Sequence, residues 1–322
     1  MRLTWLGTVL VAISFTCIHA ARAEVYPARP VRFIVPFPPG GANDTIARLL
    51  AEPLTEMLGQ QFVIDNRGGA NTIIGTSIVA KASPDGYTIL IVPGSFAINA
   101  SLYRKLPYDS RRDFVPVAMI GNGAYVVVVH PSLPVKSAAE LIALAKRRPG
   151  EIRYASSGVG NVTHVAAALF NMMAGTEMLH VPYKGGGPVM IDLLAGRVSV
   201  FFSTVSTAIP QIKAGKLRVI GATTAQPSAA LPDVPPVAQT GLPGYEVSGW
   251  YGILAPAGTP KAAIGRLNQA VRAVLRQPEL KRQLLARGVE TVDMTPEQFG
   301  GVLHAEFEKW GKVIKALNIT AD

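Results

Sequence analysis

The chain has 322 residues and a mass of 34.1 kDa, and 49% of its residues are hydrophobic whereas 16% are charged. A chain of this length and composition buries a sizeable core, which excludes an intrinsically disordered protein and favours two domains over one. The formal net charge of +10 allows a nucleic acid, an acidic membrane surface or a small anion as partner and does not choose among them.

The first 23 residues are typical of a secretory signal peptide. Arg2 gives a positive start, residues 3–18 are mostly apolar, and Ala21-Arg22-Ala23 supplies a small-x-small cleavage pattern. The apolar run is shorter than the roughly 20 residues of a membrane span, which disfavours a retained anchor. Thr16 before Cys17 disfavours a lipoprotein. We therefore expect cleavage after Ala23 and export to the periplasm.

The only cysteine of the chain, Cys17, lies in this leader. One cysteine excludes an internal disulfide, a Cys-based zinc site and a CxxC redox pair. Cleavage also removes Arg2 and Arg22 and no acidic residue, so the mature charge is 10 − 2 = +8. Because no later stretch is long and apolar enough to span a bilayer, we expect an exported, soluble protein that does not bind nucleic acid.

The chain after the leader alternates short β-rich runs with helical ones. The first expected elements are strands over 31–35, 61–65 and 87–92, a helix that ends at Leu58 before Gly59, and a helix over 76–82. Pro53 lies inside the first helix and is expected to kink or split it. This βαβα order predicts a parallel sheet covered by helices on both faces.

A second set of such elements follows, and then a helical end. The expected strands cover 125–130, 152–155, 179–181, 198–202, 217–221 and 250–255. The expected helices run from the capping box at Ser137 to Gly150, over 163–173 and 188–194, after Thr259-Pro260, over 278–287 and from Thr295 onward.

Two apolar runs, 125–130 and 250–255, bracket the middle of the chain. If both cross between two α/β lobes, residues 24–124 and 251–322 form lobe one and residues 125–250 form lobe two. Two lobes joined by a pair of crossings leave a cleft, and ligands bind at such clefts beyond the carboxyl ends of parallel strands.

Three glycine-rich loops precede expected helices and are candidates for holding an anion. They are PFPPGGAND over 36–44, SSGVGNVTH over 156–164 and KGGGP over 184–188. Glycine lets a ligand approach backbone N–H groups closely, and the helix dipole favours an anion there. The first loop is equally compatible with a tight turn capped by Asn43 or Asp44. None of the three matches a Rossmann or P-loop pattern, so no nucleotide cofactor is expected.

Catalytic and metal-binding patterns are not supported. The GxSxG, HExxH and SxxK motifs are absent, and the histidines after the leader lack metal-ligand spacing. A Ser157/His164 pair has no carboxylate placed to orient it. We expect neither enzyme activity nor a metal or cofactor.

Longer segments carry a family resemblance that covers essentially all of the chain after the leader. They are YPARPVRFIVPFPPGGANDTIARLLAEPL, NRGGANTIIGTSIVAKASPDGYTIL, YASSGVGNVTH, HVPYKGGGPVMIDLLAGRV and WYGILAPAGTP. The chain resembles the Bug-type (TctC-like) extracytoplasmic solute receptors of tripartite tricarboxylate transporters. The resemblance implies a monomeric, two-lobed α/β protein with the periplasmic-binding-protein type II fold. It also implies a small organic anion as ligand and a permease of one large and one small integral subunit as partner.

Carried over to this sequence, the resemblance implies ligand contacts from loops of both lobes. They are Phe37, Pro39, Gly40, Gly41, Asn43, Ser95, Ala97, Ser156, Ser157, Gly158, Thr163, Lys184, Gly185, Ser203 and Thr204. Ser203 replaces an Asp that is expected to hold a ligand ammonium, which argues against an amino acid. Residues 66–75 replace small residues of the family pattern with bulkier ones beside the cleft, so the resemblance does not imply that the ligand has the family-average shape.

We therefore expect a receptor for a di-, tri- or aromatic carboxylate without an amino group. The alternative from another class is a periplasmic protein that reports ligand occupancy to a sensor kinase.

Overall fold

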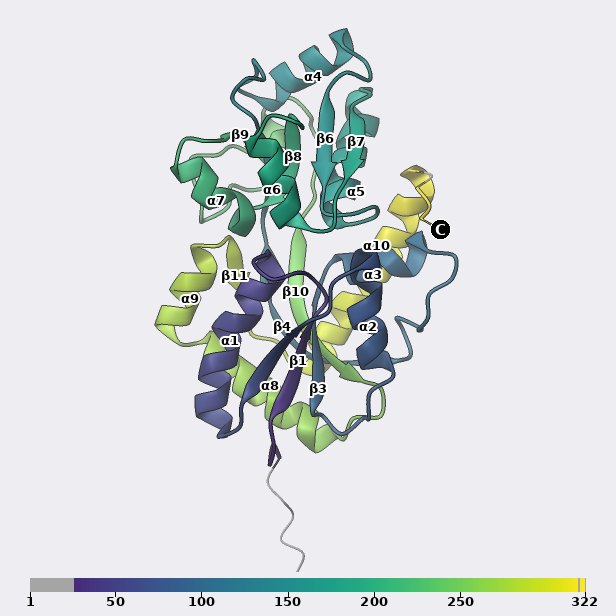
Figure 1. The fold of residues 1–322 in the computed structure, drawn as a ribbon, viewed down its shortest axis with the longest axis vertical. Coiled ribbons are helices and arrows are strands. Elements are labelled where there is room, and N and C mark those ends of the chain that lie inside the picture. The colour runs from purple at the N-terminus through teal and green to yellow at the C-terminus, as the bar shows by residue number, and fades with distance from the viewer. Residues whose placement is uncertain (1–25, 318, 322) are drawn as a thin grey trace, which may run out of the picture.

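Figure 1 shows two α/β lobes, one above the other along the long axis, in a computed structural model that describes residues 26–317 and 319–321. The predicted signal peptide over 1–23, with Cys17, lies outside the described residues. Within the described chain, no helix combines the length and the apolar character that a membrane crossing needs.

The lower sheet has the strand order β11-β4-β10-β3-β1-β2, and we call this sheet with its helices lobe one. Its strands are β1 (Val31–Val35), β2 (Phe62–Asn66), β3 (Thr88–Pro93), β4 (Phe114–Gly123), β10 (Gly249–Pro256) and β11 (Val289–Thr291). β1 pairs in parallel with β2 and β3, as predicted. The sheet as a whole is mixed, because β10 enters between β3 and β4 and runs antiparallel to both.

Six helices and one short 3₁₀ turn belong to lobe one in the described chain. They are α1 (Ala42–Leu58), η1 (Ala70–Thr72), α2 (Ile73–Ala80), α3 (Ser95–Leu102), α8 (Lys261–Leu275), α9 (Pro278–Leu285) and α10 (Pro296–Leu317). Gly59 ends α1 in the left-handed conformation, with φ 70°. Pro53 does not split α1. Pro53 and Leu49 are half-buried whereas Leu50 and Leu54 are fully buried, so the proline lies toward the solvent side of the helix, where water can satisfy the freed carbonyl.

The upper sheet has the strand order β7-β6-β8-β5-β9, and this sheet with its helices is lobe two. Its elements are β5 (Tyr125–Val129), α4 (Ala138–Arg147), β6 (Arg153–Ser156), α5 (Val162–Ala174), β7 (Leu179–Pro182), α6 (Gly186–Leu194), β8 (Val200–Thr204), α7 (Val205–Lys213) and β9 (Arg218–Ala222). Ser137 caps α4 as predicted, since its Oγ accepts a hydrogen bond from the Glu140 amide at 3.2 Å. The Glu140 carboxylate, however, accepts from the Lys136 amide at 2.8 Å and not from Ser137, as a full capping box requires. β5 runs antiparallel to both of its neighbours, β8 and β9.

The chain passes between the lobes twice, from β4 to β5 and from the segment before β10 into β10. Thr223 joins the two crossings: its N–H donates to Tyr125 O at 3.0 Å, and its Oγ1 donates to Val247 O at 2.6 Å. Gly249 is required beside this point, because a Cβ there would lie 2.4 Å from Tyr125 Cε2. β5 and β10, each antiparallel to its neighbours in its own sheet, are thus the two strands that carry the crossings.

Candidate ligand-binding site

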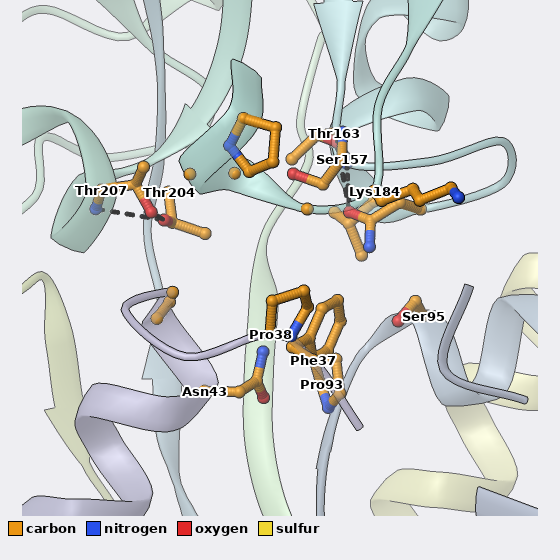
Figure 2. A pocket seen from close by; sticks show the side chains of 18 of the residues that line it. Phe37, Pro38, Asn43, Pro93, Ser95, Ser157, Thr163, Lys184, Thr204 and Thr207 are labelled. Carbon is orange, nitrogen blue, oxygen red and sulfur yellow. Dashed lines mark hydrogen bonds between the residues drawn. The ribbon is translucent and has the colours of Figure 1, made fainter. Parts of the chain in front are cut away.

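A cavity of about 60 Å³ lies between the lobes (Figure 2). Its lining from lobe one is Phe37, Pro38, Pro39, Gly41, Ala42, Asn43, Pro93, Ser95 and Tyr251. Its lining from lobe two is Tyr125, Ser157, Asn161, Val162, Thr163, Lys184, Gly185, Gly186, Gly187, Pro188, Phe201, Thr204 and Thr207. Among these lining residues of the described chain, only Lys184 is charged.

Five helices begin at this cavity, namely α1, α3, α5, α6 and α7. Each is the next helix or strand along the chain after a strand of its sheet, so its first turn lies beyond the carboxyl end of that strand. The caps Gly41, Gly94 and Gly185 make no side-chain hydrogen bond to the first turn of α1, α3 and α6. Helix N-termini leave N–H groups without intrahelical partners, and the helix dipole makes these ends favourable for negative charge. The cavity is therefore suited to an anion without needing an arginine.

Lobe one also presents two enclosed polar side chains. Asn43 is 7% exposed and Ser95 is fully buried, and neither Asn43 Oδ1 nor Ser95 Oγ has a hydrogen-bond partner among the described residues. Figure 2 shows both on the lobe-one side of the cavity, with Phe37 between them. Buried polar atoms are nearly always hydrogen-bonded in folded proteins, so these two are available to a bound molecule.

A buried carboxylate fixes the 36–41 loop. Asp44 Oδ2 accepts a hydrogen bond from the Gly40 amide at 2.9 Å, and Asp44 also contacts Arg48 and Asn66. Burial alone would raise the pKa of the Asp44 carboxyl, but the hydrogen bonds from Arg48, the Gly40 amide and Asn66 outweigh it and lower this pKa. The carboxylate therefore stays ionised while turned toward its own loop.

Hydroxyl groups dominate the lobe-two wall. Thr163 Oγ1 accepts a hydrogen bond from the Ser157 amide at 2.9 Å, and Asn161 Oδ1 accepts one from the Thr163 amide at 3.2 Å. Thr204 Oγ1 caps α7 by accepting from the Thr207 amide at 3.3 Å. These bonds fix the positions of the side chains that Figure 2 shows above the cavity.

A stack of aromatic rings supports the loop that carries Ser157. The His164 and His180 rings stack with centroids 3.9 Å apart, and Tyr154 stacks on His180 at 5.0 Å. His180 Nε2 lies 2.6 Å from Ser156 Oγ, and His164 Nδ1 accepts a hydrogen bond from the Gly160 amide at 3.0 Å. His164 thus holds the backbone of the loop, which is a structural role.

Both imidazoles are held neutral by burial. Burial, and then the neighbouring His180, lower the pKa of His164 to about 3, and burial lowers the pKa of His180 to about 4. In the unfolded chain a histidine titrates near pH 6.5, so below that pH the unfolded state binds protons that the folded state does not. The free energy of unfolding should therefore fall as the pH decreases from 6.5 to 5, by about 1.4 kcal/mol per pH unit for each group.

Urea unfolding at pH 7, 6 and 5 measures this dependence. His180→Gln, which keeps a polar partner for Ser156, should reduce the slope to about half. An unchanged slope in that variant would show that the stack is not its source.

The structure brings most of the predicted site residues to this one cavity. Phe37, Pro39, Gly41, Asn43, Ser95, Ser157, Thr163, Lys184, Gly185 and Thr204 all line it. The remaining five lie elsewhere. The Gly40 amide is bonded to Asp44, Ala97 is buried in α3, and Ser156 is fully buried against His180. Gly158 lines a neighbouring hollow of about 540 Å³, and Ser203 is fully buried with its Oγ donating to Thr204 O at 3.0 Å.

Several lining residues were not predicted. Tyr125 is the first residue of β5 and Tyr251 lies in β10, the two strands that carry the crossings. Burial raises the pKa of both phenols, so both stay neutral. The predicted crossings at 125–130 and 250–255 were a signal for these two residues. Thr207 lies in α7, a helix that the sequence pattern did not indicate.

Comparisons with known proteins agree on one family. The family model described as "Tripartite tricarboxylate transporter family receptor" matches residues 46–319. The chain belongs to this family. The predicted family is thus confirmed, and the receptor is a binding protein and not an enzyme.

Solved structures support the same assignment. An R. palustris protein with adipate is 39% identical, with a TM-score of 0.89, and the alignment covers 92% of the receptor and 99% of that chain. The periplasmic binding protein BugD is 31% identical, with a TM-score of 0.88 and coverage of 92% and 100%. MatC from Rhodopseudomonas palustris with bound malate is 29% identical, with a TM-score of 0.85 and coverage of 90% and 100%. The predicted two-lobed periplasmic-binding-protein fold is confirmed.

Metal-binding side chains do not gather in the receptor: no group of three or more His, Cys, Asp or Glu that could hold an ion occurs in the part of the chain that the structure describes.

Proposed function

We propose that the receptor captures a small organic carboxylate without an amino group in the periplasm and delivers it to a permease of one large and one small integral subunit. In this proposal the leader over 1–23 directs export and is cleaved after Ala23, and the receptor acts as a monomer. The ligand-contacting residues are those of the two lobes that line the cavity, with lobe one formed by 24–124 and 251–322 and lobe two by 125–250.

The observation that carries the proposal is the convergence of five helix N-termini on one cavity between the lobes. Amides at three uncapped helix starts and the Ser95 hydroxyl can donate hydrogen bonds to a carboxylate from lobe one and lobe two. Charge-assisted hydrogen bonds to a carboxylate contribute about 1.5–3 kcal/mol each, so a few of them support binding without a paired cation. Two relatives with adipate and malate show the same chemical class of ligand in similar folds.

The side chains around the cavity also favour an acid over an amino acid. An ammonium group needs a carboxylate or several carbonyl oxygens, and no Asp or Glu occurs among the lining residues of the described chain. At the cavity, β8 contributes Thr204, whose side chain carries a hydroxyl group and no charge. We therefore propose that an α-amino group on the ligand is strongly disfavoured.

A thermal-shift screen with matched pairs of ligands tests this proposal. Succinate against aspartate, and adipate against 2-aminoadipate, differ only in the amino group; malate and benzoate extend the set to a hydroxy acid and an aromatic acid. A ligand at about 100 times its Kd stabilises by about 2.7 kcal/mol, which should raise Tm by roughly 5 °C or more. We expect such a shift with at least one acid and none with its amino partner. A shift with amines or sugars but with no acid would overturn the proposal.

A further inference from the structure

The lobes touch directly at a place distant in sequence from the two crossings. Asn71, in the short turn η1 of lobe one, donates a hydrogen bond from Nδ2 to Val159 O of lobe two at 2.9 Å. The same nitrogen donates to Asn99 Oδ1 at 2.8 Å. Both hydrogens of the Asn71 amide are thereby used, one within lobe one and one across the cleft.

The Asn71 side chain is held in position from its own lobe. Asn99 is fully buried in α3, and its Nδ2 donates to Asn71 O at 2.8 Å and to Thr72 Oγ1 at 3.2 Å. The two asparagines therefore form a reciprocal pair. Because Asn99 fixes both the backbone and the amide of Asn71, little side-chain freedom is lost when Asn71 meets lobe two.

The backbone of this turn is unusual. Ala70, Asn71 and Thr72 all have positive φ, at 45°, 47° and 79°. Left-handed conformation costs a residue with a Cβ about 1–2 kcal/mol, so three in succession persist only where surrounding bonds hold them. Here the bonds that hold them are those to Asn99 and to lobe two.

Val159 belongs to the loop that carries Ser157 to the cavity. This loop runs from β6 to α5, and within lobe two it is held by hydrogen bonds to His164 and His180. The bond from Asn71 reaches it from the opposite lobe and exists only when the lobes are together. Opening the cleft would break the bond, whereas bonds within a lobe would survive.

We propose that Asn71 is a positioning residue that sets ligand affinity: it stabilises the closed arrangement of the lobes and fixes the Ser157 loop over the cavity, without contacting the ligand. The affinity part rests on the proposed function; the closing part rests on the contact between the lobes alone. Loss of one such hydrogen bond should shift the balance between closed and open forms by about threefold to tenfold.

Two variants and one matched control test the closing part. Asn71→Gly removes the amide and accepts the left-handed φ, and Asn71→Asp keeps the shape but replaces the donor with an acceptor facing Val159 O. Ala70→Gly is the control, because Ala70 also has a positive φ, at 45°, and its exposed methyl group cannot form a hydrogen bond. Spin labels are placed on Glu52→Cys in α1 and Lys213→Cys in α7, both exposed, in a Cys17→Ser background that has no other cysteine.

The distribution of distances between the labels is measured by pulsed electron paramagnetic resonance without ligand. Asn71→Gly and Asn71→Asp should shift population to longer distances, and Ala70→Gly should match the parent protein. The same distribution in all four proteins would overturn the proposal. Because no ligand is present, this outcome is independent of whether the carboxylate proposal holds.

Titration with adipate or malate, whichever raises Tm, tests the affinity part. The Kd should rise about threefold to tenfold in both Asn71 variants, with most of the change in the dissociation rate, and stay unchanged in Ala70→Gly. Equal affinity in all variants would show that Asn71 does not set binding.

Discussion

Replacing Gly41 with valine is expected to abolish ligand binding while the receptor stays folded. Gly41 lines the cavity as the cap of α1, and its φ of −83° is open to any residue. A Cβ there would meet only Pro38 O, at 3.9 Å, so the backbone accommodates a β-carbon in the unliganded protein. The valine side chain would, however, add bulk to the lining of the cavity at the first turn of α1, where we propose that the carboxylate binds. Loss of two charge-assisted bonds would weaken binding about 100-fold or more.

Isothermal titration calorimetry with the responding acid measures this effect, and thermal unfolding checks the fold. The control is Gly301→Val, the same change at an exposed position of α10 that has no atom within 4 Å of its Cβ. If Gly41→Val binds the acid as tightly as the parent protein does, the 36–41 loop is not part of the site.

Gly160→Ala is expected to prevent full closure of the cleft and so to weaken binding tenfold or more. A Cβ on Gly160 of lobe two would lie 1.7 Å from Leu102 Cδ2 of lobe one. Leu102 is 1% exposed and packs in the core, so it has little room to move away. The lobes must separate or the loop carrying Ser157 must shift, and either change separates the ligand contacts of the two lobes.

A matched variant separates this clash from backbone strain. Gly160 has φ 73°, and Gly150 has φ 74° with no atom within 4 Å of its Cβ position. Gly150→Ala and Gly160→Ala should each lose about 1–2 kcal/mol of stability from the left-handed backbone. Only Gly160→Ala should lose affinity, as measured by calorimetry. If both variants bind equally well, the contact with Leu102 plays no part in closure.

Local signals in the sequence account for much of the fold. Gly59 and Ser137 mark helix ends because their effect depends only on adjacent residues: a left-handed glycine ends α1, and a hydroxyl caps α4. The loops at 36–41 and 156–161 were recognisable for the same reason, since glycine and proline restrict or free the backbone wherever they occur.

Elements that depend on tertiary packing were missed. The helix α7 contains Pro210 and begins with Val205, both unfavourable inside a helix, and it forms because Thr204 caps it and its apolar face is buried in lobe two. The antiparallel direction of β10 is likewise decided by where the chain returns from lobe two, which no local pattern records.

The residues of the candidate site divide in the same way, into those with a local sequence signal and those that tertiary packing brings to the cavity. Loop residues such as Phe37 and Ser157 were found because glycine-rich turns before helices are visible in the sequence. Tyr125 and Tyr251 are 126 positions apart along the chain and meet at the cavity only because β5 and β10 both begin near the crossings. Gly40 has the local pattern of a binding residue, but its amide is bonded to Asp44, a choice made by the fold of the loop.

The hydrogen bonds of Thr223 have a consequence for how the receptor responds to ligands of different size. Thr223 bonds to both crossings, at Tyr125 O and Val247 O, and so keeps the two connections side by side. We expect two neighbouring connections to act as one hinge near Thr223, with the largest displacement at the rim farthest from it. A longer acid should then stop the rotation earlier than a shorter one, so that the length of the bound molecule sets the angle between the lobes.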